Sequence, residues 1–231
     1  MLHLFFTRLS ALAIAGLLLL GSPAPAQSAD TAASQHSQPV KIRLSAPRIP
    51  PLAESKWTEE QAKVLGPLKQ GAPMFGTVLK AHNVLATLAQ HEEARKKFDV
   101  WANHVMGATN TLPPREREIL ILRIGWLCQS EYEWGQHVVI GRAVGLTDEE
   151  IARIKLGAEA KGWSAHDALL IRAADELDKD AFVSDATWNG LAKTYNTQQM
   201  MDVVFTVGQY NLVSMALNSF GVQLDEGVKG F

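Results

Sequence analysis

Two long stretches of this chain are apolar on nearly every side of a helix. One contains ILILRIGWL at residues 119–127, and the other is MMDVVFTVGQYNLVSMALNSF at residues 200–220. A surface helix carries one apolar stripe, whereas a helix that is apolar all round is buried in a core or in an interface between subunits. Elsewhere in the chain, no stretch alternates apolar and polar residues as a half-buried strand would. We therefore expect an all-α fold built around these two helices.

Residues that begin and end helices recur along the chain and support this fold class. A Ser, Thr or Asn side chain caps the first free N–H groups of a helix, Pro suits the first turn, and Gly suits the end. The expected capping boxes are Thr58 with Gln61, Thr147 with Glu150 and Asn196 with Gln199; Ser164 and Ser184 are simple caps; Pro113 and Pro114 start a helix over about 114–129; Gly145 and Gly221 end helices.

The first residues have the pattern of an export signal. Arg8 precedes an apolar run from residue 9 to 20, and Ala24-Pro25-Ala26 offers the small residues that a signal peptidase recognises. We predict a signal peptide at 1–26, a flexible leader at 27–46 and a helical domain at 47–231. The expected location is the periplasm or the medium, with no membrane association after cleavage following Ala26; an uncleaved anchor is the alternative.

Charge and cysteine content narrow the classes of partner. The chain has 22 Lys and Arg against 24 Asp and Glu, a net charge of −2, which gives no reason to expect a nucleic-acid partner. Its single cysteine, Cys128, cannot form an internal disulfide, and its apolar surroundings predict a buried small hydrophobe. His82, His91, His104 and His166 lack metal-ligand spacing, so we expect neither a metal nor another cofactor.

Three polar residues recur on one helical face in the segment SEYEWGQH. Ser130, Glu133 and His137 are spaced i, i+3 and i+7. A carboxylate one turn from an imidazole can fix its tautomer and raise its basicity, which would make His137 an acid or base near neutral pH. The alternative is an ordinary Glu–His pair on a helix surface.

Two further positions could contribute to a site. Glu118 stands at the start of the apolar helix and could face inward, where burial favours the protonated carboxyl; a surface cluster with Arg115, Glu116 and Arg117 is the alternative. Gln209, Tyr210, Asn211 and Asn218 lie within the second apolar helix and predict either structural hydrogen bonds or the wall of a pocket.

The segment TLPPREREILILRIGWLCQSEYEWGQHVVIGRAVGLTDEEIARI, residues 111–154, resembles the carboxymuconolactone decarboxylase-like superfamily, which includes alkylhydroperoxidase D. A looser resemblance covers about 47–226. It implies an all-α bundle that assembles as trimers or hexamers. In the peroxidase branch, C-x-x-C-x-x-x-H is the redox centre, and a glutamate twelve residues before the first cysteine joins the histidine in a proton relay. In the decarboxylase branch, a Glu four residues before the His is similar to Glu133 and His137.

The residues of this chain depart from the peroxidase pattern. Glu118 and His137 match the relay, but Ser130 and Glu133 stand at the two cysteine positions, with Tyr132 between them. Peroxide reduction by that route needs a nucleophilic and a resolving thiol, and Cys128 is expected on nearly the opposite helix face from Ser130. Because the relay residues are present and the two cysteines are not, this pattern favours acid/base chemistry over redox chemistry.

The leading hypothesis is a cofactor-independent enzyme acting on a small organic acid, lactone or related oxygenated compound, by decarboxylation, isomerisation or a related lyase step. His137 would be the acid or base, Glu133 would orient it, and Glu118 would complete the relay; Ser130, Tyr132 and Tyr210 would contact the substrate. The alternatives are a peroxiredoxin or alkylhydroperoxidase-type antioxidant and a non-enzymatic helical oligomer that binds a small molecule. The apolar helices predict a homo-oligomer in each case.

Overall fold

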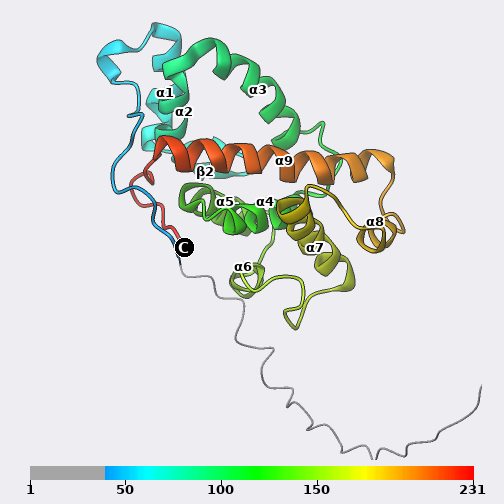
Figure 1. Ribbon diagram of the computed structural model, residues 1–231. Coiled ribbons are helices and arrows are strands. Elements are labelled where there is room, and N and C mark those ends of the chain that lie inside the picture. Colours follow the sequence, from blue (N-terminus) through cyan, green and yellow to red (C-terminus); the bar gives the residue numbers. More distant parts are fainter. Residues whose placement is uncertain (1–39) are drawn as a thin grey trace, which may run out of the picture. The chain divides into compact units, whose positions relative to one another are not determined.

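Helix α4 (Pro114–Leu127) is the centre of the fold in this computed structural model, which describes residues 40–231. Every α4 residue from Arg117 to Trp126 is buried. It packs against α5 (Glu131–Ala143), α7 (Ala165–Asp180) and α9 (Thr197–Phe220), as Figure 1 shows. The predicted all-α fold and the predicted buried helix are both confirmed.

The other helices are shorter or lie at the periphery of this group. They are the 3-10 helices η2 (Glu54–Lys56) and η3 (Ala89–His91), and the α-helices α1 (Glu59–Gln70), α2 (His82–Leu88), α3 (Glu92–Met106), α6 (Asp148–Ile154) and α8 (Asp185–Leu191). The three capping boxes and two serine caps form as predicted, and Gly221 ends α9 in the left-handed conformation, with φ +70°. Local side-chain chemistry therefore sets these helix boundaries.

A small hairpin between α1 and α2 was not predicted. Strands β1 (Ala72–Met74) and β2 (Thr77–Leu79) pair antiparallel, with Ala72 opposite Leu79. Both turn residues have positive φ, 50° at Phe75 and 79° at Gly76. Two-residue turns of this kind favour Asn-Gly or Asp-Gly. The turn here has the sequence Phe-Gly, so this signal of a hairpin is absent from the sequence.

Helices α4 and α9 run in the same direction, side by side. Before α4, Thr111 donates to Asp202 near the start of α9, and after α4 the carbonyl of Cys128 accepts from Asn218 near its end. The face of α9 toward α4 is buried, but its opposite face exposes Met201, Phe205, Leu212 and Met215. The second apolar helix is therefore buried on one side only within this chain.

The extended segment PRIPPL, residues 47–52, lies against the helical domain. The backbone N–H groups of Arg48 and Ile49 donate to the carbonyl of Phe220, and that of Leu52 donates to the carbonyl of Ala86. The predicted signal peptide and the leader up to residue 39 lie outside the described residues. Within residues 40–231, no helix has both the length and the hydropathy needed to cross a membrane.

Candidate active site

The site begins with a buried pair formed by Glu118 on α4 and His137 on α5. Glu118 Oε2 lies 2.7 Å from His137 Nδ1, and the two residues are 0 % and 6 % exposed. Helices α4 and α5 are joined by residues 128–130 only and pack against each other, so side chains from both can meet between them. The family resemblance implied that these two residues share a relay, and the structure brings them into contact.

This contact determines which ring nitrogen of His137 is available for chemistry. When Glu118 is ionised, Nδ1 carries the proton and donates it to the carboxylate. The lone pair of the neutral imidazole is then on Nε2, for which no described residue provides a hydrogen-bond partner. A base oriented in this way is suited to taking a proton from a bound molecule.

Glu133 does not orient His137, so this sequence prediction is wrong. Its Oε2 accepts a hydrogen bond of 2.6 Å from Ser214 on α9, while its Oε1 has no partner among the described residues. The i, i+4 spacing places Glu133 and His137 on one side of α5, but the Glu133 carboxyl turns toward α4 and α9, where a Cβ on Gly125 would lie 2.8 Å from Oε1. Glu118 takes the role that we expected of Glu133.

The environment of Glu133 favours its neutral form. Burial raises the pKa of this carboxyl well above its ordinary value, and the nearby charge of Glu118 acts in the same direction. The hydrogen bond from Ser214 lowers the pKa but does not outweigh burial. Glu133 is therefore placed to hold a proton.

These groups adjoin an open cavity of about 660 Å³ lined mainly by residues of α2, α3, α5 and α9. Of the six predicted site residues, His137, Glu133, Tyr132 and Tyr210 line it. Glu118 lies behind His137 and does not line the cavity. Ser130 does not line it either, and its buried Oγ has no partner among the described residues.

The two tyrosines in the cavity wall differ in what their hydroxyls do. Tyr132 donates a hydrogen bond of 2.5 Å to Asp225, so its hydroxyl is already used in holding the segment after α9. The ring of Tyr210 meets that of His137 edge-on, with centroids 4.7 Å apart. No described residue hydrogen-bonds the Tyr210 hydroxyl, which leaves it available to a ligand.

Sequence reasoning missed Gln136, which lines the cavity, and two residues that hold side chains of the wall from outside it, Ser214 and Asp225. Ser214 holds Glu133; Asp225 accepts from Tyr132 and Gln136; and Gln136 also donates to the carbonyl of Lys80. Ser214 follows Tyr210 by one helical turn, and this spacing could have indicated it. Asp225 lies beyond α9 in a segment without periodicity, so no comparable signal marks it.

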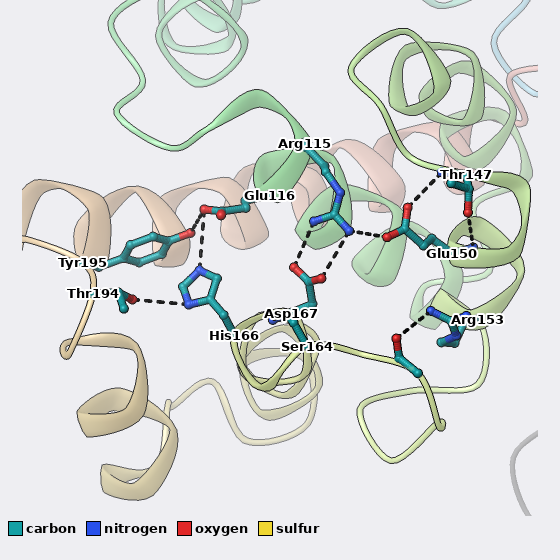
Figure 2. Close-up of polar contacts among 11 residues, drawn as sticks. Arg115, Glu116, Thr147, Glu150, Arg153, Ser164, His166, Asp167, Thr194 and Tyr195 are labelled. Atoms are coloured by element: carbon teal, nitrogen blue, oxygen red, sulfur yellow. Dashed lines mark hydrogen bonds and ion pairs between the residues drawn. The ribbon is translucent and has the colours of Figure 1, made fainter.

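A second Glu–His–Tyr cluster lies near the start of α4 (Figure 2). Glu116 accepts from the Tyr195 hydroxyl and lies 3.6 Å from His166 Nε2, while His166 Nδ1 is 3.3 Å from the Thr194 hydroxyl. Next to it, Arg115 bridges Glu150 on α6 and Asp167 on α7. None of these residues lines the large cavity, so the cluster ties helices together.

Cys128 has the environment of a structural cysteine. It is half-buried against the core, and burial, followed by the charge of Glu133, raises the pKa of its thiol to about 12. Among residues 40–231, no three His, Cys, Asp or Glu side chains gather in a way that could hold a metal ion.

A family model matches part of the chain. Residues 93–176 match the Carboxymuconolactone decarboxylase family, a span that contains Glu118, Glu133 and His137. No curated protein matches the sequence.

Solved structures share the fold at low identity. A peroxidase-related protein with an alkylhydroperoxidase AhpD core, from Ralstonia eutropha JMP134, is 16% identical with a TM-score of 0.65, over 82% of this chain and 95% of that one. A peroxidase-related protein from Silicibacter sp. TM1040 is also 16% identical, with a TM-score of 0.65, over 80% and 93%. The debrominase Bmp8 is 10% identical with a TM-score of 0.61, over 77% and 92%. Residues 93–176 are thus similar to the carboxymuconolactone decarboxylase family, and the chain shares its fold with AhpD-like structures.

Proposed function

We propose that this protein is a cofactor-independent enzyme that moves a proton on a small oxygenated carbon compound. The observation that carries the proposal is the buried contact of 2.7 Å between Glu118 and His137, with His137 in the wall of a cavity of about 660 Å³. Glu133, whose pKa is raised by burial, supplies a proton donor in the same wall. A base and an acid kept apart by their environments is the arrangement that general acid–base catalysis needs.

The proposed cycle uses one base and one acid. His137 Nε2 takes a proton from a carbon next to a carbonyl, and Glu118 stabilises the imidazolium that forms. Glu133 donates a hydrogen bond to the carbonyl oxygen as negative charge develops there. Return of the proton from His137 to a different carbon gives an isomer and restores both residues. Loss of carbon dioxide from a β-keto acid would form the same enolate and draw on the same donor.

A thiol peroxidase is the competing function, because two of the structural neighbours are named as peroxidase-related. That chemistry needs an accessible thiolate and a second thiol. The chain has one cysteine, and the pKa of its thiol is raised to about 12. Of the two functions, the arrangement around His137 favours proton transfer.

Assembly and location complete the proposal. We propose that the exposed apolar face of α9, formed by Met201, Phe205, Leu212 and Met215, packs against another copy in a homo-oligomer. Sedimentation of the purified protein tests this assembly, and a monomer at micromolar concentration would contradict it.

The sequence pattern of residues 1–26 supports export to the periplasm or the medium.

The decisive experiment screens the purified protein against lactones, ketones, keto acids and hydroperoxides. Deuterium exchange and isomer formation, carbon dioxide release and peroxide loss are followed in parallel. We expect turnover of a carbon acid that His137→Ala abolishes and that His104→Ala, a change outside the cavity wall, retains. Peroxide loss that survives His137→Ala, or no turnover of any compound, would count against the proposal and favour a binding protein.

A further inference from the structure

We infer that the substrate of this site is uncharged: a largely apolar lactone, ester or ketone rather than a carboxylate. This inference rests on the proposed function and specifies its substrate class. It comes from the charges in the cavity wall, from the unused hydrogen-bonding atoms there, and from the apolar character of the remaining lining.

The one arginine in the described cavity wall is already neutralised. Arg95 on α3 donates from Nε and Nη2 to both oxygens of Glu92, at 3.1 and 2.8 Å, and from Nη1 to Asp99, at 2.5 Å. Two carboxylates therefore surround one guanidinium. A substrate carboxylate would have to displace one of them to form an ion pair here.

Both histidines of the wall are already engaged by other groups of the protein. His91 caps α3 by accepting the backbone N–H of Ala94 on Nδ1. His137 is coupled to Glu118, and any positive charge that it gains is matched by that carboxylate.

The other charges near the reacting groups are acidic or lie behind the wall. Glu118 and Glu133 are fully or almost fully buried, at 0 % and 2 % exposed, and neither carboxyl can serve as a counter-ion for an ionised substrate. Arg117 is buried on the same helix, but it is absent from the cavity lining. An ionised carboxylate transferred to this site would lose its hydration without gaining a counter-ion.

The polar atoms that remain unused suit a neutral oxygen. Thr87 and Glu133 belong to the cavity wall, and their Oγ1 and Oε1 atoms are buried and have no partner among the described residues. The amide of Gln209, also in the wall, has no hydrogen bond to a described residue. A hydroxyl, a protonated carboxyl and an amide can each donate to a carbonyl oxygen.

The rest of the lining is mostly apolar, including Phe98, Val105, Ile140, Val213 and Leu217. Such a surface gains affinity from an apolar substrate and gives none to an ionised group. Among the reactions open to the site, the apolar lining favours proton transfer next to the carbonyl of a lactone, ester or ketone. Decarboxylation is disfavoured because its substrate must bring in a carboxylate.

Binding of matched acid and ester pairs tests the inference without requiring turnover. The probes are octanoate with methyl octanoate and phenylacetate with methyl phenylacetate, titrated into the full-length protein at pH 7.5 by ligand-observed NMR. We expect each ester to bind more than about tenfold more tightly than its acid. The inference would be overturned if the acids bound as tightly as the esters or more tightly, or if none of the four probes bound.

Removing the partners of Arg95 tests the charge argument itself. The double variant Glu92→Gln and Asp99→Asn frees the guanidinium, and we expect it to shift the acid-to-ester affinity ratio by about tenfold toward the acid. Glu93→Gln, on the exposed side of the same helix turn, is the matched control and should leave the ratio unchanged. An unchanged ratio in a folded double variant would contradict the argument.

The inference and the proposed function can fail separately. His137→Ala should abolish turnover while it keeps the preference for esters, because the preference is assigned to the whole wall. Loss of the preference without loss of turnover would overturn the substrate class alone. An intact preference in a protein that turns over none of the compounds would overturn the proposed function alone.

Discussion

Helix α4 carries two glutamates, two residues apart, and each forms a cluster with a histidine and a tyrosine. Glu118 meets His137, whose ring meets Tyr210 edge-on at 4.7 Å; Glu116 meets His166, whose ring meets Tyr195 edge-on at 4.8 Å. The residue types and ring geometry are almost the same. The two clusters nevertheless differ in two properties that decide whether a histidine can act on a ligand: the burial of the cluster and the hydrogen-bonding atoms that it leaves without a partner.

The difference lies in burial and in unused atoms. In the outer cluster, Glu116 and His166 are partly exposed and their hydrogen-bonding atoms are shared with Tyr195 and Thr194 (Figure 2). In the inner cluster, Glu118 Oε1 has no partner among the described residues, and His137 and Tyr210 face a cavity. Composition alone therefore does not distinguish an active site from a structural tie.

The largest expected contrast is between the two glutamates. Glu118→Gln lets the amide donate to Nδ1 of His137, which moves the proton to Nε2 and removes the base. We expect turnover to fall by about 10²- to 10⁴-fold. Glu116→Gln should leave turnover within about twofold. Steady-state kinetics on both variants, with circular dichroism to confirm folding, decides this; equal losses in the two would remove the distinction.

The next contrast concerns Glu133 and pH. Because burial raises the pKa of this carboxyl above its ordinary 4.5, the folded state keeps a proton that the unfolded chain releases as the pH rises past that value. Stability is therefore lost with increasing pH from about 4.5 up to the folded pKa, by at most about 1.4 kcal/mol per pH unit. Glu133→Gln should remove this loss.

Denaturant unfolding from pH 4.5 to 8 measures the effect. Relative to the wild type, Glu133→Gln should gain stability as the pH rises, whereas Glu149→Gln, an exposed change on α6, should run parallel to the wild type. A Glu133→Gln curve parallel to the wild type would show that this carboxyl ionises normally in the folded protein.

The tyrosines should respond in opposite ways to loss of the hydroxyl. Tyr195→Phe removes a hydrogen bond to Glu116, so we expect about 1–2 kcal/mol lower stability with unchanged turnover. Tyr210→Phe removes a hydroxyl that no described residue binds, so stability should hardly change while substrate affinity falls about fivefold, the value of about one hydrogen bond. Thermal unfolding together with KM measurements separates the two, and the reverse pattern would contradict the site assignment.

The smallest effect is expected at Cys128. With a thiol pKa of about 12, only about one molecule in 10⁵ carries a thiolate at pH 7. Cys128→Ser and treatment with iodoacetamide should both leave turnover unchanged. Loss of activity in either experiment would revive the thiol peroxidase alternative.

Local patterns predicted the fold better than they predicted the site. The capping boxes at Thr58, Thr147 and Asn196 depend on residues three apart and formed as expected. The contact between Glu118 and His137 was suggested by the family resemblance and depends on the short α4–α5 turn. The orientation of Glu133 could not be predicted, because its partner Ser214 lies 81 positions away on α9.

Gly125 explains how the α4–α5 pair accommodates so long a side chain at position 133. The glycine lies against the Glu133 carboxyl, and even a methyl group there would approach Oε1 to 2.8 Å. The sizes of these two residues are therefore coupled, and relatives should show correlated substitution at positions 125 and 133. A long side chain at position 133 should occur with glycine at position 125. Alanine or serine at position 125 should occur only where the side chain at position 133 is short. A change of chemistry at position 133 would then need two substitutions, made in an order that keeps the helices packed.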